Sequence, residues 1–551
     1  MTALAVVTRN VFPEPLRTSR TRGRSGLRGI AAVMALAVAV LAAAEARPAR
    51  GQAIVTTFPG ISFTDVGSSL TPPDTMGAVG IDDVVMFCNG GYAVYDKAGT
   101  RTSFTSDRQF WIDAGLPAAT VAVGISDPRI TFDPTVSRWF ATEITVTSSN
   151  NLVLVGRSDT ADPKGSWKAT SYVGVPGFFA DYDALGVDSR NVYVGSNNFD
   201  LGTQEFVGVG MTVIPKADIL APTPTVANAL FITDTTAAIG APPRGVTNYS
   251  GDPGHGVLMA TDAFSWQTTT RVTVNGSGTA ATLSPPVSIA TAYDAAPGPF
   301  NPAQPGGTPI DVVDSRYTGA ITQVGNDIYM TNTVLNGDRD AVHWLVVDER
   351  TNAIVGEGLI ADPAFDFLQP SIGVNPDGTF LLGFNRVGTS ATIGDIGIYA
   401  AVGTTSDSGI SVGSPFLLAA GTVANFIGPT FDSGTVKRWG DYSATVVDPT
   451  NPNLFWTFQE IPATATDWTT RVTAVVVPEP SALALAGLGL SAAAWLATRP
   501  GGGQGAASRR SSGRSGRSSA ASAAASARYD ATTSGSSAAR SVVSYGSAMR
   551  S

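Results

Sequence analysis

The 551-residue chain is poor in cysteine, histidine and charge: it has one cysteine and two histidines, and 14% of its residues are charged. A single cysteine, Cys88, cannot form an internal disulfide, and the apolar run around it predicts a buried thiol. With only His255 and His343 available, a three-histidine zinc site or a Ser-His-Asp triad is almost excluded. His343 lies in the strand-like run 342–346, which predicts a packed side chain.

The first 46 residues predict a secretory signal peptide. Six arginines, from Arg9 to Arg28, form a basic segment, and an apolar run from Ile30 to Ala44 follows it. Ala44-Glu45-Ala46 then has the small-x-small pattern that signal peptidase accepts. A retained N-terminal anchor is the alternative.

Charge is distributed unevenly along the chain. Residues 47–498 hold 21 basic and 41 acidic side chains, a net charge of −20. Nucleic-acid binding needs a basic footprint, so this balance gives no electrostatic case for it. An acidic body fits an exported protein, and its carboxylate-rich loops suggest Ca²⁺ as a cofactor.

A second processing segment is predicted at residues 477–499. Pro478-Glu479-Pro480 precedes an apolar stretch from Ala482 to Thr498, and Arg499 follows that stretch. The prolines interrupt regular structure, seventeen apolar residues can just cross a bilayer, and the arginine favours the cytoplasmic side. A plain tail anchor or a buried helix is the alternative.

These three parts in order resemble the PEP-CTERM sorting signal of exosortase substrates. The resemblance covers about 25 residues. It implies that a membrane-embedded exosortase processes the chain near Pro478–Pro480, after transient anchoring by the C-terminal helix, and leaves the body at the cell surface or outside the cell. Residues 500–551, rich in Ser, Ala, Gly and Arg, depart from the short tails of that family and predict a disordered segment.

The body, residues 47–476, shows almost no helical periodicity and repeats one strand-rich unit. Each copy alternates small and apolar residues, reaches Asp or Asn, turns, and enters an apolar strand. Copies begin at Asp74, Asp127, Asp181, Thr318, Gln369 and Asp441. The first three are 53 and 54 residues apart, and the 137-residue gap before Thr318 has room for one degenerate copy around 256–259.

A repeat of about 50 residues matches one four-stranded blade, so the sequence predicts an all-β fold, a β-propeller of seven blades. Small residues such as Gly77, Gly186 and Ala444 suit the crowded innermost strands. A large β-sandwich or two all-β domains is the competing fold. The blades also loosely resemble the sialidase-like superfamily of secreted propellers, because 405–412 matches an Asp-box turn with Val in place of Trp and 162–167 is a degenerate copy. In that family these boxes are structural.

Candidate ligand-binding residues are those that open the inner strands, since they gather at one mouth of a propeller channel. They are Asp74, Asp127, Arg129, Asp181, Asp183, Gln369, Arg438 and Asp441. Facing carboxylates predict Ca²⁺ binding, and Arg129 with Arg438 predicts contact with an anionic sugar. The alternative is that these groups tie neighbouring blades together by hydrogen bonds.

Two enzymatic interpretations are weaker. A sialidase-type site would need three arginines such as Arg129, Arg316 and Arg438 around a nucleophile, Tyr182 or Tyr442, and no spacing links them. A glycosidase could pair Asp181 with Asp183, since residues two apart on a strand share a face. The leading hypothesis is therefore a non-enzymatic surface propeller that binds matrix polysaccharide or a surface protein. A glycosidase or lyase at the channel mouth is the alternative, and a purely structural role is the third.

Overall fold

The structure is a computed structural model that describes residues 51–147, 150–293, 301–389, 396–406 and 409–478. The predicted signal peptide 1–46, the sorting segment 477–499 except for its first two residues, and the tail 500–551 lie outside these ranges. In the part of the chain that is described, no helix has the length and apolar character needed to cross a membrane.

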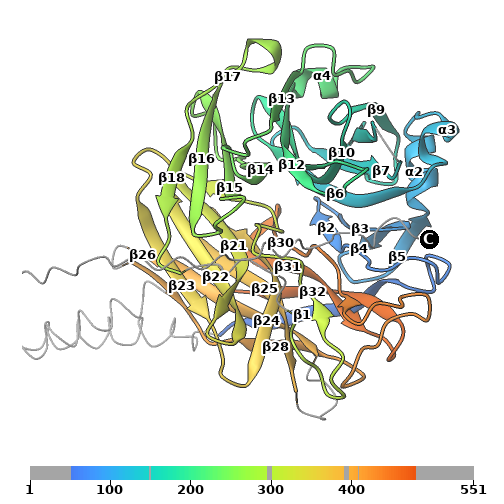
Figure 1. Ribbon diagram of the computed structural model, residues 1–551, viewed down its shortest axis with the longest axis vertical. Helices are drawn as coiled ribbons and strands as arrows, with labels where there is room; N and C mark the ends of the chain where they lie inside the picture. The colour runs from blue at the N-terminus through green and yellow to red at the C-terminus, as the bar shows by residue number, and fades with distance from the viewer. Residues whose placement is uncertain (1–50, 148–149, 294–300, 390–395, 407–408, 479–551) are drawn as a thin grey trace, which may run out of the picture. The chain divides into compact units, whose positions relative to one another are not determined.

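Seven antiparallel sheets stand around a common axis and form a β-propeller (Figure 1). This confirms the predicted fold and the predicted number of blades. The innermost strands, in blade order, are β2 (Met76–Val79), β6 (Ile125–Asp133), β10 (Phe179–Val187), β14 (Ala241–Gly245), β20 (Thr322–Val324), β24 (Phe365–Val374) and β30 (Ala444–Asp448).

Each inner strand pairs with a largely buried second strand, and a third strand follows. The second strands are β3 (Asp83–Cys88), β7 (Arg138–Thr145), β11 (Asn191–Phe199), β15 (His255–Thr261), β21 (Asp327–Asn336), β25 (Thr379–Gly388) and β31 (Asn451–Pro462). The third strands are β4 (Gly91–Asp96), β8 (Leu152–Ser158), β12 (Phe206–Pro215), β16 (Thr268–Asn275), β22 (Arg339–Asp348), β26 (Gly397–Ser406) and β32 (Trp468–Val476).

The outermost strands are more exposed than the strands inside them. They are β5 (Arg101–Thr105), β9 (Trp167–Val173), β13 (Leu230–Asp234), β17 (Thr282–Leu283) with β18 (Val287–Ala290), β23 (Ile354–Ile360), β27 (Gly409–Val412) with β28 (Phe416–Ala420), and β1 (Ala53–Ser62). The fourth blade is the degenerate copy predicted near 256–259, since those residues lie in β15. Cys88 and His343 are buried, as predicted.

The seventh blade joins the two ends of the propeller. Its order is β30-β31-β32-β1, so the first strand of the described chain is the outer strand of the last blade. Ala53 pairs with Val476, and the antiparallel ladder continues to Ser62 and Thr469. This pairing closes the ring without a covalent link, and it covers the edge that β32 would otherwise expose.

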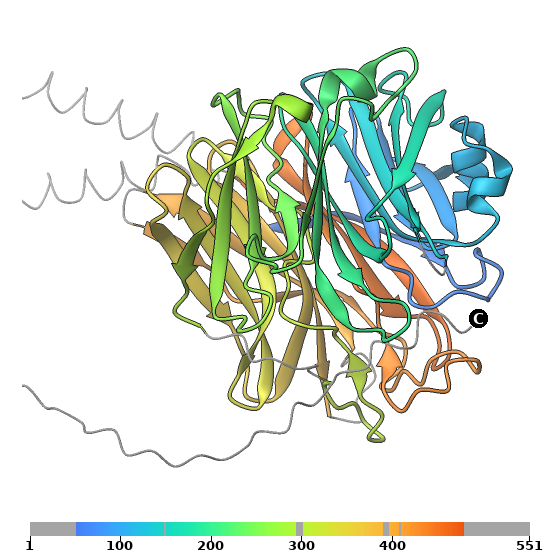
Figure 2. The ribbon, with the colours of Figure 1, turned by 45° about the horizontal axis from the view of Figure 1, so that its top comes forward.

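Neighbouring blades stand side by side around the axis, as Figure 2 shows in a tilted view, and apolar side chains fill the space between them. Between the second and third blades, Phe140 and Val155 belong to one buried cluster with Val192 and Val194. Near the axis the blades approach so closely that a Cβ on Gly186 would lie 2.0 Å from the carbonyl oxygen of Gly245. The inner strands are therefore crowded near the axis, and small residues occupy them as predicted.

Two long connections carry structure of their own. The segment before β20 contains β19 (Ile310–Asp311), and the segment before β30 contains β29 (Lys437–Arg438); the two pair in parallel. The recurring unit predicted to begin at Thr318 leads into β20, which begins at Thr322 and pairs with β21. The short helices α2 (Asp107–Asp113) and α3 (Ala118–Val121) link the first two blades, and α4 (Lys216–Leu220) follows β12.

Candidate functional site

Residues at the starts of the inner strands, or in the segments that lead into them, form one mouth of the channel, and several of them adopt left-handed backbone. Positive φ angles occur at Asp74 (47°), Asp127 (65°), Tyr182 (65°), Val313 (65°) and Gln369 (50°). In β6, β10 and β24 the left-handed residue coincides with a break in the pairing register with the second strand. Such bulges redirect side chains, and strained backbone of this kind clusters at functional sites.

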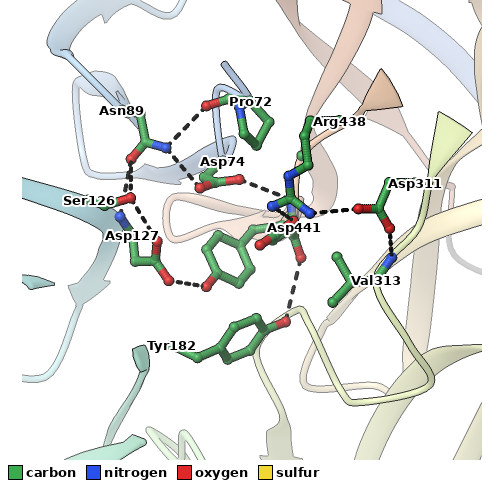
Figure 3. A network of polar contacts seen from close by, with 12 residues as sticks. Pro72, Asp74, Asn89, Ser126, Asp127, Tyr182, Asp311, Val313, Arg438 and Asp441 are labelled. Carbon is green, nitrogen blue, oxygen red and sulfur yellow. Dashed lines mark hydrogen bonds and ion pairs between the residues drawn. The ribbon is translucent and has the colours of Figure 1, made fainter. Parts of the chain in front are cut away.

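Asn89 and Asp74 tie three blades together at the mouth (Figure 3). The Asn89 amide donates to Asp74 Oδ2 at 2.8 Å, and its oxygen accepts from the backbone of Asp127 at 3.1 Å. The other Asp74 oxygen accepts from the backbone of Asp441 at 2.9 Å. Burial, reinforced by the charges of Asp441 and Asp127, raises the pKa of Asp74 well above its usual range. The alternative that these residues join neighbouring blades is thus correct for Asp74.

Arg438 links the mouth to the paired connections above it. Its guanidinium donates to Asp441 Oδ1 at 2.7 Å and to Asp311 Oδ2 at 2.8 Å. The three side chains are partly exposed, at 26% for Arg438, 15% for Asp441 and 24% for Asp311. Arg438 lies in β29 and Asp311 in β19, so this ion pair also fixes the two connections to each other.

Below the mouth the channel is filled by two tyrosines and three arginines. Tyr442 donates to Asp127 at 2.5 Å, and its ring lies 3.4 Å below the guanidinium carbon of Arg129. Arg129, Arg316 and Arg244 surround the ring of Tyr182 at 5.1, 4.5 and 5.9 Å. All five side chains are buried. These contacts form a closed floor, defined here as Arg129, Tyr182, Arg244, Arg316 and Tyr442.

The tyrosines of this floor are not activated nucleophiles. Burial raises the pKa of Tyr182, and the neighbouring arginines offset that effect only in part. Burial and the charge of Asp127 raise the pKa of Tyr442 well above its usual range. A phenol that resists ionisation is a poor nucleophile, so the sialidase-type interpretation does not fit these two residues. Its third arginine, Arg438, also lies outside the floor.

Several buried polar atoms at the mouth and in the floor have no hydrogen-bond partner in the described structure. They are Nε and Nη2 of Arg129, both carboxylate oxygens of Asp183, Oε1 of Gln369 and both carboxylate oxygens of Glu460. Gln369 uses its amide nitrogen to donate to Gly440 O at 2.7 Å. Burial raises the pKa of Asp183 and of Glu460 well above their usual ranges. Unpaired buried groups of this kind mark positions for water or a ligand.

Asp181 differs from the other carboxylates. Its residue is partly exposed, and among the described residues no lysine, arginine or histidine lies within ion-pair distance of it. Burial raises its pKa to about 7, with a further contribution from Asp127 and with Arg316 opposing. A carboxyl group with this pKa is half protonated at neutral pH, which suits a general acid.

The predicted pairing of Asp181 with Asp183 is wrong. A register break between Asp181 and Ala184 places left-handed Tyr182 between them, so they no longer share a face. Asp183 is fully buried and its pKa responds chiefly to burial and Arg129. The carboxylates that Asp181 senses are Asp127 and Asp441, which come from other blades.

The predicted Ca²⁺ site finds no counterpart in the described residues, where no three acidic, histidine or cysteine side chains are grouped to hold a metal ion. Their carboxylates bind Asn89, Arg438 and Tyr442 instead. Sequence reasoning missed four residues of this region, which are Asn89, Arg244, Asp311 and Glu460. Asn89 and Glu460 lie at or near the mouth ends of second strands, outside the recurring unit that led to the other candidates.

Comparison with known proteins gives a fold likeness only. No family model matches the chain, and no curated protein matches it. A protein of unknown function from Dyadobacter fermentans has 11% identity and a TM-score of 0.36 over 78% of this chain and 100% of its own. An α-L-arabinanase of Cellvibrio cellulosa, solved with arabinohexaose, has 10% identity and a TM-score of 0.31 over 62% of this chain and 95% of its own. A thermostable family-43 glycoside hydrolase has 12% identity and a TM-score of 0.28 over 65% and 93%. Likeness at this level assigns no activity to the chain.

Proposed function

We propose that the protein is carbohydrate-active and hydrolyses a glycosidic bond at the channel mouth, with Asp181 as the acid and Asp441 as its carboxylate partner. The observation that carries the proposal is the meeting of Asp127, Asp181 and Asp441, from three different blades, in one another's electrostatic field at a partly exposed edge. Glycosidases need two carboxyl groups in unlike environments.

Asp181 and Asp441 lie in different environments, as an acid and a carboxylate partner require: one favours the protonated form and the other the ionised form. Arg438 donates to Asp441 and favours its ionised form, partly offsetting burial. Asp181 has no such partner, so it retains a proton more readily. Asp181 would protonate the leaving glycosidic oxygen, and the Asp441 carboxylate would act as nucleophile or as the base for water.

The charge around the mouth favours a neutral sugar. Burial favours the protonated, uncharged forms of Asp74, Asp183 and Glu460, so the charges of Arg129, Arg244, Arg316 and Arg438 are roughly balanced by the remaining acids, which are Asp127, Asp181, Asp311, Asp314 and Asp441. The mouth therefore offers an anionic glycan no net electrostatic attraction. We therefore propose a neutral sugar in place of the anionic sugar that Arg129 and Arg438 suggested from the sequence.

The test uses the full chain and measures reducing sugar released from neutral polysaccharides, namely arabinan, galactan and xylan, with alginate and a sialylated oligosaccharide for comparison. We expect release from a neutral polymer and a loss of kcat of about 10²- to 10⁴-fold in Asp181→Asn with little change in KM. Asp113→Asn, on the exposed outer side of α2, is the matched control and should retain activity.

A second candidate is recognition without turnover, and the closed floor of buried side chains favours it. Saturable binding of a polysaccharide, with no product from any substrate and no effect of Asp181→Asn, would establish that role and overturn hydrolysis. Either role uses the same mouth, so Arg438→Ala should weaken glycan binding in both.

We also propose, from the sequence alone, that the chain is exported and that an exosortase-type enzyme processes it at Pro478-Glu479-Pro480. Cell fractionation of the full chain and of Glu479→Ala tests this. We expect the unaltered chain outside the cell and the variant retained in the membrane fraction. Equal distribution of the two proteins would contradict the sorting role of the motif.

A further inference from the structure

A cavity of about 290 Å³ lies at the opposite end of the inner strands from the mouth. Its walls come from the β6–β7 turn, the β10–β11 turn, α4, and the connection between β14 and β15, and they include Val136, Ser189, Lys216, Leu220 and Tyr249. A volume near 300 Å³ is at the lower end of the range for small-molecule sites.

The cavity is separate from the mouth because the same strands lead from one to the other. β6 runs from Asp127 at the mouth to Asp133, beside the cavity, and β10 runs from Asp181 to the turn that carries Ser189. At about 3.3 Å per residue, six to eight residues span roughly 20–26 Å.

One side of the cavity is polar and has unused hydrogen-bond donors. The ammonium group of Lys216, whose residue is 4% exposed, forms an ion pair with Asp133 and donates to Asp188 O at 2.8 Å. An ammonium group has three donors, so one remains without a protein acceptor. Asn248 uses its oxygen to accept from Ser250, and within the described structure its amide nitrogen has no protein acceptor.

The other side is apolar. Val136, Ala217 and Leu220 line it together with the ring of Tyr249, whose hydroxyl group is engaged with Thr131 at 3.0 Å. A ligand that fits both sides has one C–H face and one edge rich in hydroxyl groups. Asp133 neutralises Lys216, so the cavity offers no net positive charge to an anion, and the ammonium group disfavours a cation.

We propose that this cavity is a second binding site, for one neutral sugar unit, on the face opposite the mouth. The inference does not depend on hydrolysis at the mouth. Two sites at opposite ends of the inner strands would let one molecule hold two glycan chains, or two parts of one chain, without any change in the fold.

The test is isothermal titration of the full chain with D-glucose, D-galactose and L-arabinose, and with citrate as an anionic probe. We expect one of the sugars to bind with a Kd on the order of millimolar, as suits a ligand of about a dozen heavy atoms. Ala217→Trp fills the cavity and should weaken this binding at least tenfold. Ala227→Trp, on the exposed loop after α4 and outside the cavity, should not.

Further variants separate this site from the mouth. Asp181→Asn should leave the cavity's affinity unchanged, even if it abolishes hydrolysis. Leu220→Phe, which reduces the volume conservatively, repeats the test should Ala217→Trp fail to fold. Sugar binding that neither cavity-filling variant weakens, no sugar binding at all, or preferential binding of citrate would overturn the proposal.

Discussion

Four inner strands, β6, β10, β24 and β30, have acidic or amide side chains near both ends and use them for different purposes. At the far end Asp133, Asp188, Asn375 and Asp448 accept from the backbone two residues on, at 2.8, 2.7, 3.1 and 2.9 Å. These contacts cap the turn into the second strand. At the mouth, Asp74, Asp127 and Asp181 come from left-handed or bulged backbone, and Asp74 and Asp181 both lie in the electrostatic field of Asp127.

This difference shows that an inner strand can have stabilising contacts at one end and strained backbone at the other. At the far ends the turn side chains accept from the backbone of their own blade, and ion pairs such as Lys216 with Asp133 join neighbouring blades. The mouth ends depend on groups from other blades, and they leave oxygens of Asp183, Gln369 and Glu460 without partners. Binding and chemistry are expected where the fold leaves such needs unmet.

The largest expected effect tests the claim that the far end is stabilising. Lys216→Met leaves Asp133 buried without its ion-pair partner, and we expect the free energy of unfolding to fall by about 3–5 kcal/mol in urea titrations. Lys168→Met, which removes an exposed contact to Pro222, should change it by less than about 0.5 kcal/mol. A loss below about 1 kcal/mol for Lys216→Met would contradict the claim that contacts at the far end stabilise the fold.

A turn residue tests the same end without an ion pair. Asn375→Ala removes the acceptor for the backbone of Asp377 and Thr379, so we expect a loss of about 1–3 kcal/mol. Because no ionisation is involved, the loss should be equal at pH 5 and pH 8 by thermal unfolding. A pH-dependent loss would show that the far end, too, is governed by charge.

At the mouth, unlike the far end, we expect the free energy of unfolding to depend on pH. The pKa of Asp181 is raised to about 7 in the folded state, so the folded protein binds more protons than the unfolded chain between about pH 4 and pH 7. The free energy of unfolding should therefore fall as the pH rises through this window. Asp181→Asn should reduce that slope and stabilise the protein at pH 8 by about 1–2 kcal/mol, less than the full pKa shift implies because the residue is partly solvated. Equal slopes for the two proteins would refute the assignment.

The smallest effect concerns backbone strain at the far end. Ser137 has φ of 51° in the β6–β7 turn, a conformation that glycine adopts without steric cost. Ser137→Gly should change stability by less than about 1 kcal/mol in the stabilising direction, since relief of strain exceeds the entropy cost. Measurable destabilisation would mean that the serine side chain contributes more than its backbone costs.

Much of the architecture could be predicted from the sequence because each blade must place small residues at the axis and an apolar strand beside them. The spacing of Asp74, Asp127 and Asp181 predicted the period, and the gap after Asp181 predicted the fourth blade. The closing role of β1 could not be predicted, since Ala53–Ser62 reads as one more amphipathic strand and its partner β32 lies more than 400 residues away.

The candidate site was predicted in part. The recurring unit located Asp74, Asp127, Asp181 and Asp441, which do gather at one mouth. It could not show that Tyr182 would be left-handed and separate Asp181 from Asp183, because bulges depend on pairing with the next strand. Arg244 was not predicted because the degenerate fourth blade lacks the recurring unit found in the other six blades.

The closure of the seventh blade has a mechanical consequence. Ala53 and Val476 are paired neighbours in an antiparallel ladder, so tension applied to the chain at these two residues would separate β1 from β32 one hydrogen bond at a time. A force applied at residue 476 alone would not act across the β1–β32 ladder, so the ring would stay closed. We therefore expect the propeller to withstand attachment at one end of the chain and to open when it is pulled at both ends.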